Sequence, residues 1–187
     1  MSIPRDRFLV AAFGGSLGAT TINRAVFELA DRWAQRNDVA IRHAVGKRDW
    51  HDASLKRPNA EAGLLIYQAI EFEDRMGDVL TAADIVICRA GATTIAELAV
   101  TAMPSVLVPF PKATGDHQSA NARMLADADA AIAVPDGECD GARLSDVISP
   151  LVVDRRRLQS MGDAARRFAA PNAASDVAAL IEKHVGK

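Results

Sequence analysis

Short apolar runs alternate with amphipathic segments along most of the chain, and this alternation limits the possible folds more than any other feature. Apolar runs of strand length occupy residues 7–13, 39–45, 63–69, 84–88, 105–109 and 130–134. Segments with helical spacing lie between them, at residues 19–35, 75–82, 93–101 and 116–127. Several runs are apolar at every position, which indicates strands that are buried on both faces. The pattern predicts an α/β fold with a doubly wound, mostly parallel, Rossmann-like sheet and helices on both faces.

After residue 140 the pattern is helical only. Residues 142–152, 154–168 and 172–185 are expected to form helices that Pro150 and Pro171 separate. A chain of 187 residues has the length of one domain. We therefore expect a single domain over residues 1–187, with a helical C-terminal extension that packs back on the sheet or reaches a neighbour.

Charge and cysteine content exclude several classes of protein. The formal net charge is -2 and no long run of one sign occurs, which argues against a nucleic-acid partner. Cys88 and Cys139 match no metal-binding or disulfide pattern, so we expect a reducing cytoplasmic location and no bound metal. No stretch approaches 18 uninterrupted apolar residues, and the N-terminus does not resemble a signal peptide. The sequence thus predicts a chain that neither spans a membrane nor leaves the cell by the usual route.

The first chemically informative stretch is FGGSLGAT, residues 13–20. It matches the G-x-S-x-G nucleophile elbow of hydrolases, but an elbow needs oxyanion donors from an earlier loop, and Ser16 already follows the first strand. His117 and Asp84 would have to complete the triad. The glycines Gly15 and Gly18 also suit a loop that cradles an anion at a helix start, with Ser16 as a donor. A third interpretation is a tight turn in which Ser16 caps the helix.

The second stretch is CRAGATTIAEL, residues 88–98, which directly follows a buried strand. Gly91 and Ala92 leave room for a ligand, and Thr93 and Thr94 offer hydroxyl and N–H groups at a helix start. Glu97 could accept both hydroxyls of a ribose. The alternative is a capping box, in which Thr94 and Glu97 close the helix end on themselves. Two loops of the same kind favour a nucleotide.

The third stretch is VPFPKATGDHQSANARML, residues 108–125. Asp116 can cap the helix that follows. Gln118 and Asn121 share a face near its start, and amide side chains suit the hydroxyls of a sugar. The alternative for this pair is an ordinary solvated surface. His117 has no partner at metal-binding spacing.

Taken together, these stretches and HAVGK, EFEDRM and ADIVICRAGATTIAEL resemble the C-terminal half of the MurG-type glycosyltransferases of the GT-B superfamily. That family transfers N-acetylglucosamine from UDP-GlcNAc to a lipid-linked muramyl-pentapeptide in peptidoglycan synthesis. The resemblance runs from about residue 7 to the end and keeps the order and spacing of the motifs. It implies a donor-binding domain of an inverting, metal-independent hexosyltransferase without a cofactor.

The resemblance also implies a role for each matching position. Ser16, with Gly15 and Gly18, would meet the phosphates, and Arg89 would brace the second loop. The uracil edge would be read by the backbone at Glu73, after Phe72. The remaining contacts would be made by Gly91, Ala92, Thr93 and Thr94 to the pyrophosphate, Glu97 to the ribose, and Gln118 and Asn121 to the GlcNAc hydroxyls.

Two departures from the family pattern stand out. Many relatives continue His-Gln where His43 is followed by Ala44, so any role of that amide is absent. The resemblance covers only the C-terminal half of the family pattern, so the N-terminal domain, which in the family carries the general base and the acceptor and membrane surface, is expected to be absent. We therefore expect half an enzyme that is inactive alone and that meets the lipid-linked acceptor at the inner face of the cell membrane through the missing half. Alternatives are a separate donor subunit of a two-chain transferase, a non-catalytic nucleotide-sugar-binding protein, and an isomerase of the UDP-GlcNAc 2-epimerase type.

Overall fold

The computed structural model describes residues 3–52, 55, 58 and 63–185, and this part of the chain forms a six-stranded sheet. All neighbouring strands pair in parallel, in the order β3-β2-β1-β4-β5-β6. The strands are β1 (Phe8–Phe13), β2 (Val39–Ala44), β3 (Ile66–Ile70), β4 (Ile85–Cys88), β5 (Ser105–Leu107) and β6 (Ala131–Ala133). The doubly wound parallel sheet expected from the apolar runs is confirmed.

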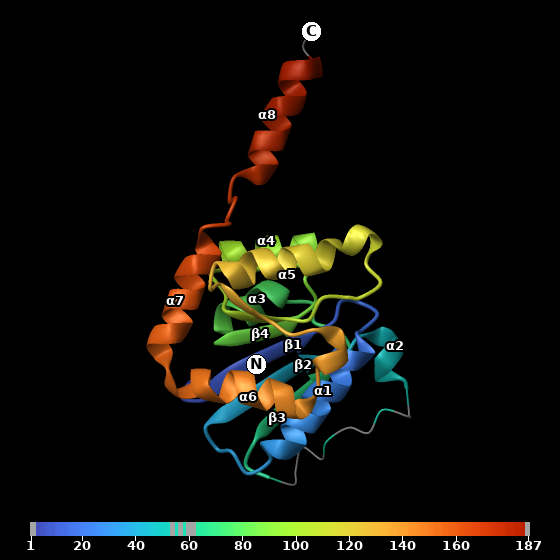
Figure 1. Cartoon of the computed structure of the whole chain (residues 1–187), viewed down its shortest axis with the longest axis vertical. Helices are drawn as coiled ribbons and strands as arrows, with labels where there is room; N and C mark the ends of the chain where they lie inside the picture. Colours follow the sequence, from blue (N-terminus) through green and yellow to red (C-terminus); the bar gives the residue numbers. More distant parts are fainter. Residues whose placement is uncertain (1–2, 53–54, 56–57, 59–62, 186–187) are drawn as a thin grey trace.

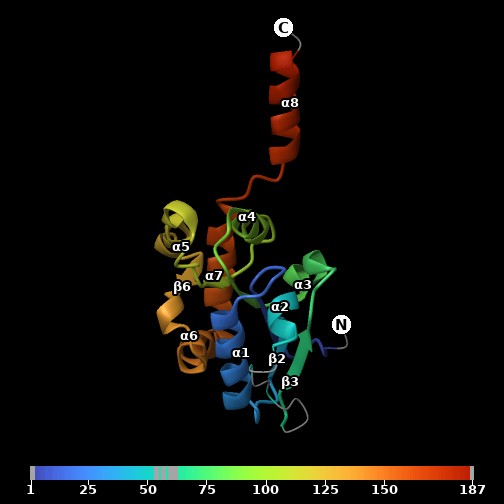
Figure 2. The ribbon, with the colours of Figure 1, turned by 90° about the vertical axis from the view of Figure 1, so that its right-hand side faces the viewer.

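Helices cover both faces of this sheet, as Figures 1 and 2 show. The helices are α1 (Thr20–Arg32), α2 (Lys47–Trp50), α3 (Met76–Ala82), α4 (Ala92–Val100), α5 (His117–Asp127), α6 (Gly141–Val153), α7 (Arg155–Arg166) and α8 (Ala173–Val185). Helices α1 and α6 pack into one core layer, and α3, α4 and α5 pack into the other. The alternating pattern did not reveal α2, because its four residues are too few to show a period.

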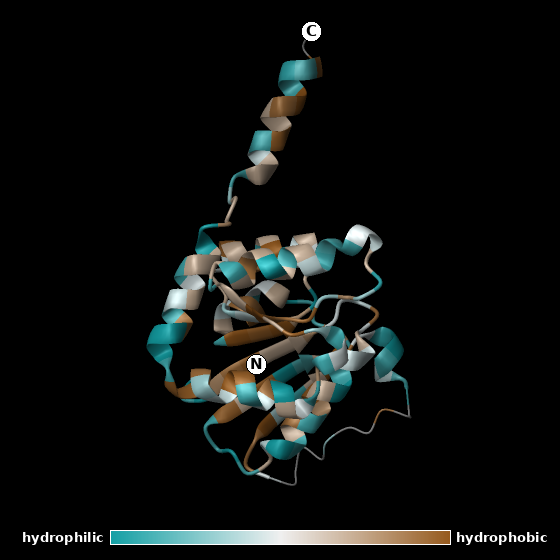
Figure 3. Cartoon of the chain, in the orientation of Figure 1, coloured by the Kyte–Doolittle hydropathy of each residue, from teal (hydrophilic) through white to brown (hydrophobic). Residues whose placement is uncertain are grey.

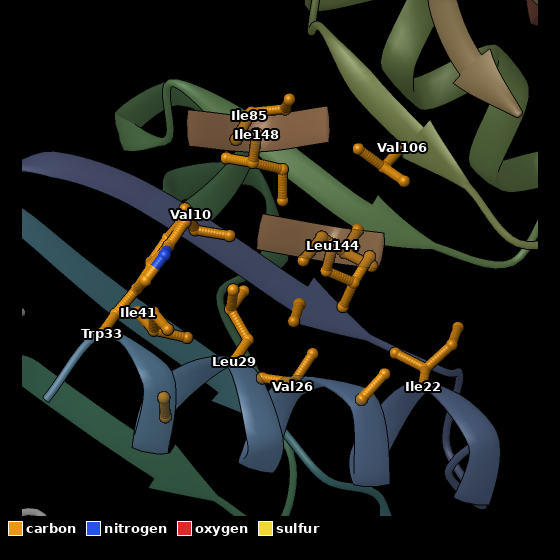
Figure 4. Packing of buried hydrophobic residues seen from close by; sticks show 14 of the residues in the cluster. Val10, Ile22, Val26, Leu29, Trp33, Ile41, Ile85, Val106, Leu144 and Ile148 are labelled. Carbon is orange, nitrogen blue, oxygen red and sulfur yellow. The ribbon is translucent and has the colours of Figure 1, made fainter. Parts of the chain in front are cut away.

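The two core layers follow from the alternation of side chains along the strands. In β1, Val10 faces the layer of α1 and α6, and the next residue, Ala11, faces the layer of α3 to α5. Figure 4 shows Val10 beside Leu29 of α1 and Leu144 and Ile148 of α6, and all four side chains are fully buried. Because every residue of β1 is buried, the strand has no polar alternation. Figure 3 shows the same distribution, with hydrophobic strands inside and hydrophilic helix faces outside.

The first C-terminal helix lies where it was expected, but Pro150 does not end it. Pro150 lies inside α6, which ends at Val153 with Asp154 at its C-cap position. The side chain of Asp154 accepts a hydrogen bond from the Arg157 N–H at 3.0 Å and caps the start of α7. This capping residue terminates one helix and begins the next, so Pro150 does not separate them, contrary to the prediction.

Two of the three helices pack back on the domain, as expected, because α6 contacts α1 and α7 contacts α4. Helix α8 points away from the sheet (Figures 1 and 2) and has no buried residue. Its exposed apolar side chains are Val177, Leu180, Ile181 and Val185. No helix in the described part of the chain combines the length and the apolarity needed to cross a bilayer.

Candidate functional site

The three informative loops leave the sheet side by side. Because the strands are parallel, their carboxyl ends share one edge, where Phe13 of β1 pairs with Cys88 of β4 and Cys88 pairs with Leu107 of β5. The strand order reverses between β1 and β4, and open α/β sheets bind ligands at such a reversal. The candidate site therefore lies over the carboxyl ends of β1, β4 and β5.

A pocket of about 620 Å³ opens at this edge. Five of the expected site residues line it: Gly15, Ser16, Gly18, Arg89 and Gln118. Its charged lining consists of Arg48, Arg89, Lys112 and Asp136. The other expected residues lie outside this lining: Phe72, Glu73, Gly91, Ala92, Thr93, Thr94, Glu97 and Asn121.

The first loop is held in a shape that only glycine adopts easily. Gly15 and Gly18 have φ angles of +92° and +90°. A Cβ atom on Gly18 would stand 2.4 Å from the Val45 carbonyl oxygen. The Gly18 N–H donates to the Gly15 carbonyl at 3.0 Å, so it closes a turn. Gly18 thus shapes the loop, and its own N–H is already engaged.

Ser16 does not cap the helix, contrary to one of the three interpretations. Helix α1 has Ala19 at its N-cap position and no side-chain capping hydrogen bond. Ser16 is exposed at the pocket, and its carbonyl oxygen accepts from the Lys47 N–H at 3.0 Å. The hydroxyl therefore remains a candidate donor to a ligand.

The hydrolase interpretation is also wrong. The Asp84 carboxylate accepts from the Leu9 N–H at 2.7 Å, at the amino end of β1. Ser16 follows the carboxyl end of the same strand, so the length of β1 separates the two side chains. The His117 Nδ1 atom is engaged with the Thr114 carbonyl oxygen at 2.6 Å. These positions assemble no Ser-His-Asp triad.

A buried network of polar side chains supports the first loop from the core. This network was not predicted from the sequence. Asn23, His43 and Asp49 are 0%, 0% and 2% exposed. The Asn23 side-chain N–H groups donate to the Val45 carbonyl and to the Asp49 carboxylate, both at 2.8 Å. The Asp49 carboxylate also accepts from the Thr20 hydroxyl at 2.9 Å. The network therefore ties the start of α1 to β2 and α2.

Arg89, in the second loop, ties that loop to the third loop and to the segment after β6. Its Nη1 atom donates to the carbonyls of Val108 and Pro109, both at 3.1 Å. The same atom forms an ion pair of 2.5 Å with Asp136, which also accepts from the Thr21 hydroxyl at 3.2 Å. Asp136 is separated from Arg89 by 47 residues, so no local pattern could reveal the pair.

The second loop leads into a helix that no side chain caps. Helix α4 begins at Ala92, with Gly91 at the N-cap position and no side-chain capping hydrogen bond. Thr94 is already inside the helix, so the capping box is wrong. Glu97 is exposed. Burial raises the pKa of the Cys88 thiol, and the nearby Glu97 charge adds to that rise.

The third loop is joined to its neighbours by the two amide side chains. Gln118 accepts from the Phe110 N–H at 2.9 Å, and Asn121 donates to the Ala90 carbonyl at 3.0 Å. Both amides are therefore fixed at the ends of β5 and β4 rather than being loose on the surface. Asp116 occupies the N-cap position of α5 without a side-chain capping bond, and it accepts from the Ser119 hydroxyl instead.

The loop after β3 is held by an ion pair. The Arg42 guanidinium contacts the Glu73 carboxylate at 2.8 Å, and the same carboxylate accepts from the Arg75 N–H at 3.2 Å. Phe72 is 55% exposed beside it. The Glu73 side chain thus fixes the shape of the loop whose backbone was expected to read a base.

The described residues contain no group of three or more His, Cys, Asp or Glu side chains placed to hold a metal ion. Cys88 and Cys139 are free and buried. Burial raises the pKa of Cys139 to about 12, with the Asp136 charge as the next contribution.

The chain is similar to glycosyltransferases of known families. The model of the glycosyltransferase family 28 C-terminal domain matches residues 9–177. A protein of Myxococcus xanthus, named UDP-N-acetylglucosamine--N-acetylmuramyl-(pentapeptide) pyrophosphoryl-undecaprenol N-acetylglucosamine transferase, is 40% identical over 177 residues, which are 94% of this chain and 45% of the relative. A protein of the same name from Nitratidesulfovibrio vulgaris is 44% identical over 172 residues, 88% of this chain and 44% of the relative.

A solved structure shows the same relationship. The crystal structure of Acinetobacter baumannii MurG superposes with a TM-score of 0.82 at 31% identity, covering 97% of this chain and 51% of that one. The chain therefore spans about half the length of the curated relatives it matches.

Proposed function

The chain belongs to the glycosyltransferase family 28 C-terminal domains, and on this premise we propose that it is the donor-binding half of a UDP-N-acetylglucosamine transferase that makes a peptidoglycan precursor. The names of the relatives indicate the donor and the lipid-linked acceptor. The pocket at the reversal of strand order supplies the place where the donor would bind.

The observation that carries the proposal is the position of two helix starts at one edge of the sheet. Helices α1 and α4 follow the adjacent strands β1 and β4, and each helix starts next to a glycine-containing loop. Helix N-termini attract anions through their unpaired N–H groups and the helix dipole. A diphosphate lying between Ser16 and the Gly91–Thr94 segment would use both, and Arg48 and Lys112 add positive charge to the lining of the pocket.

The remaining contacts follow the order of the loops along the sheet. The Glu97 carboxylate would accept the ribose hydroxyls, and the backbone at Glu73, next to Phe72, would read the uracil edge. Gln118 and Asn121 would meet the sugar hydroxyls with the polar atoms that their hydrogen bonds to Phe110 and Ala90 leave over.

The reaction would proceed with inversion at the anomeric carbon of the donor sugar. An acceptor hydroxyl forms the new C–O bond on one face while the bond to the diphosphate breaks on the other, and UDP leaves. The hydroxyl proton passes to a base in the other half of the enzyme. This half stabilises the leaving diphosphate with helix starts and arginine and lysine side chains, so no metal ion is required.

Apolar side chains are exposed at the same edge of the sheet, and this exposure supports the proposal that the second half of the enzyme covers the pocket. Leu17, Phe72 and Phe110 are 63%, 55% and 42% exposed. The half that covers them would carry the acceptor and the general base, and would bring the protein to the inner face of the cell membrane as a peripheral protein in the cytoplasm. It would be either a preceding domain or a separate subunit. A non-catalytic nucleotide-sugar-binding protein would use the same pocket.

Calorimetric titration tests the proposed function. The chain should bind UDP and UDP-GlcNAc more tightly than GDP, and UDP-GalNAc shows whether the sugar is read. Glu97→Ala should weaken UDP binding by about 1.5–3 kcal/mol, because one charge-assisted contact to the ribose is lost. Glu182→Ala, on the exposed α8, is the matched control and should change nothing. A chain that binds none of these nucleotides contradicts the proposal.

A further inference from the structure

Arg48 is a charged residue of the pocket to which neither the sequence pattern nor the family resemblance assigned a role. It belongs to the short α2, which follows β2, and it lines the pocket beside the first glycine loop. Its Nη2 atom donates to the Gly18 carbonyl and to the Thr20 hydroxyl, both at 3.3 Å. The guanidinium therefore lies directly against the loop that we propose to bind a diphosphate.

A buried carboxylate holds Arg48 in this position. The Arg48 Nε atom donates to Asp49 at 2.7 Å, and Asp49 is 2% exposed while the Arg48 side chain is 58% exposed. Asp49 is itself fixed by hydrogen bonds from Asn23 and Thr20. The pair therefore joins a rigid buried anchor to a solvent-exposed cation, so the guanidinium is oriented before any ligand arrives.

The contacts of Arg48 leave donors for a ligand. A guanidinium has five N–H groups, and the hydrogen bonds to described residues use Nε and Nη2. The Nη1 atom is left for a further acceptor. The two N–H groups of Nη1 can each donate to a phosphate oxygen, and the permanent positive charge of the guanidinium strengthens these hydrogen bonds.

The other arginine of the pocket is engaged differently. Arg89 is 14% exposed, and its Nη1 atom is shared among Asp136 and the carbonyls of Val108 and Pro109. Asp136 lines the pocket as well, so its carboxylate neutralises Arg89 at the place where an anion would lie. Asp49, in contrast, lies behind Arg48 in the core. Arg48 is therefore the better placed of the two to offer charge to a ligand.

We propose that Arg48 is a further binding residue for the diphosphate of the bound nucleotide, and that Asp49 is the positioning residue that holds it against the Gly14–Thr20 loop. This inference rests on the proposed function. It adds to that function a charged contact carried by the loop after β2.

The test measures the affinities of three ligands for four proteins. UDP, UMP and uridine are titrated calorimetrically into the parent chain, Arg48→Ala, Arg48→Lys and the control Arg36→Ala. Arg36 also pairs with an aspartate, Asp38, through its Nε and Nη2 atoms, and this pair lies before β2, at the opposite edge of the sheet. The control thus removes an arginine and its ion pair away from the pocket.

Arg48→Ala should weaken UDP roughly tenfold or more and leave uridine unchanged, because only the phosphate contact is lost. The affinity for UMP should fall less than the affinity for UDP, and Arg48→Lys should retain part of the affinity for UDP. Equal weakening of UDP and uridine would mean that Arg48 only shapes the loop, and unchanged UDP affinity would mean that it does not touch the ligand. Either result overturns the inference while the proposed function stands, provided that the parent chain binds UDP.

Asp49→Asn separates positioning from neutralisation. If Asp49 positions Arg48, this variant should bind UDP more weakly than the parent chain, with little change for uridine. If Asp49 only cancels the charge of Arg48, the variant should bind UDP more tightly, and the positioning role is wrong. Thermal unfolding of each variant, compared with that of Arg36→Ala, shows that the proteins titrated are folded.

Discussion

Asn23 and His43 are both completely buried, and a hydrogen bond of 2.9 Å joins the Asn23 Oδ1 atom to the His43 Nε2 atom. Because the Asn23 Nδ2 atom already donates to Val45 and Asp49, its Oδ1 atom must accept. The His43 Nε2 atom therefore donates to Asn23, and the Tyr67 hydroxyl lies 2.9 Å from the Nδ1 atom on the other side of the ring. The support of the first glycine loop thus includes an oriented hydrogen bond between two buried side chains.

Asn23→Ala should destabilise the protein by about 2–4 kcal/mol, because it removes three hydrogen bonds and leaves their partners buried. Urea denaturation followed by circular dichroism measures this change. Asn172→Ala, at an exposed position before α8, is the control and should stay within about 0.5 kcal/mol of the parent. A similarly small change for Asn23→Ala would show that the network does not stabilise the fold.

Gly18→Ala should both destabilise the chain and weaken nucleotide binding. The new Cβ atom would meet the Val45 carbonyl at 2.4 Å, and the φ angle of +90° disfavours any side chain. We expect a loss of about 2 kcal/mol or more in the free energy of unfolding.

Gly77→Ala is the control for that substitution, because no atom lies within 4 Å of its Cβ position and the residue is in helix α3. It should be neutral or stabilising by up to about 1 kcal/mol. If both variants behaved alike, the strain assigned to the first loop would be absent.

The raised pKa values of the two buried cysteines should make the free energy of unfolding depend on pH. Burial raises the pKa of Cys88 and raises that of Cys139 to about 12, from an ordinary value of 9.0. The folded state therefore keeps protons that the unfolded state loses, so the stability that each neutral thiol contributes is complete below pH 9 and is lost as the pH rises toward the raised pKa. The slope is up to about 1.4 kcal/mol per pH unit for each thiol.

Urea denaturation of the parent chain and of Cys139→Ala between pH 8 and pH 10.5 measures this effect. The variant should lose stability with pH less steeply than the parent. A thiol reagent at pH 8 should modify both cysteines only after unfolding. Parallel pH profiles, or rapid modification of the native chain, would contradict the burial of the thiols.

Helix α8 should contribute nothing to the stability of the domain. Removing residues 170–187 deletes no buried side chain among the described residues of that segment. The free energy of unfolding of residues 1–169 should match that of the full chain within about 0.5 kcal/mol. A larger loss would show that α8 packs on the domain in solution.

Much of the fold is predictable from the sequence, for a physical reason. Strands buried on both faces need apolar side chains at nearly every position, so runs such as that of β4 stand out. The parallel arrangement then places the following loops at one edge, which is why Ser16, Arg89 and Gln118 line one pocket.

The details of the site depend on partners that the fold brings together from distant parts of the chain. Asp136 is the partner of Arg89 across 47 residues, and Asp49 carries no pattern that marks it as buried. The capping box failed for another reason, since the same Thr and Glu spacing fits the interior of a helix as well as its start. Only the position of Ala92 at the beginning of α4 decides between them.

The proposed donor site requires one diphosphate to bind between the Gly14–Thr20 loop and the Gly91–Thr94 helix start. A crystal structure of the chain with bound UDP would show where this diphosphate lies. We expect phosphate density in contact with Ser16 on one side and with Thr93 and Thr94 on the other, with Glu97 at the ribose. Density for UDP at another place, with both loops open to solvent in the same crystal, would contradict it.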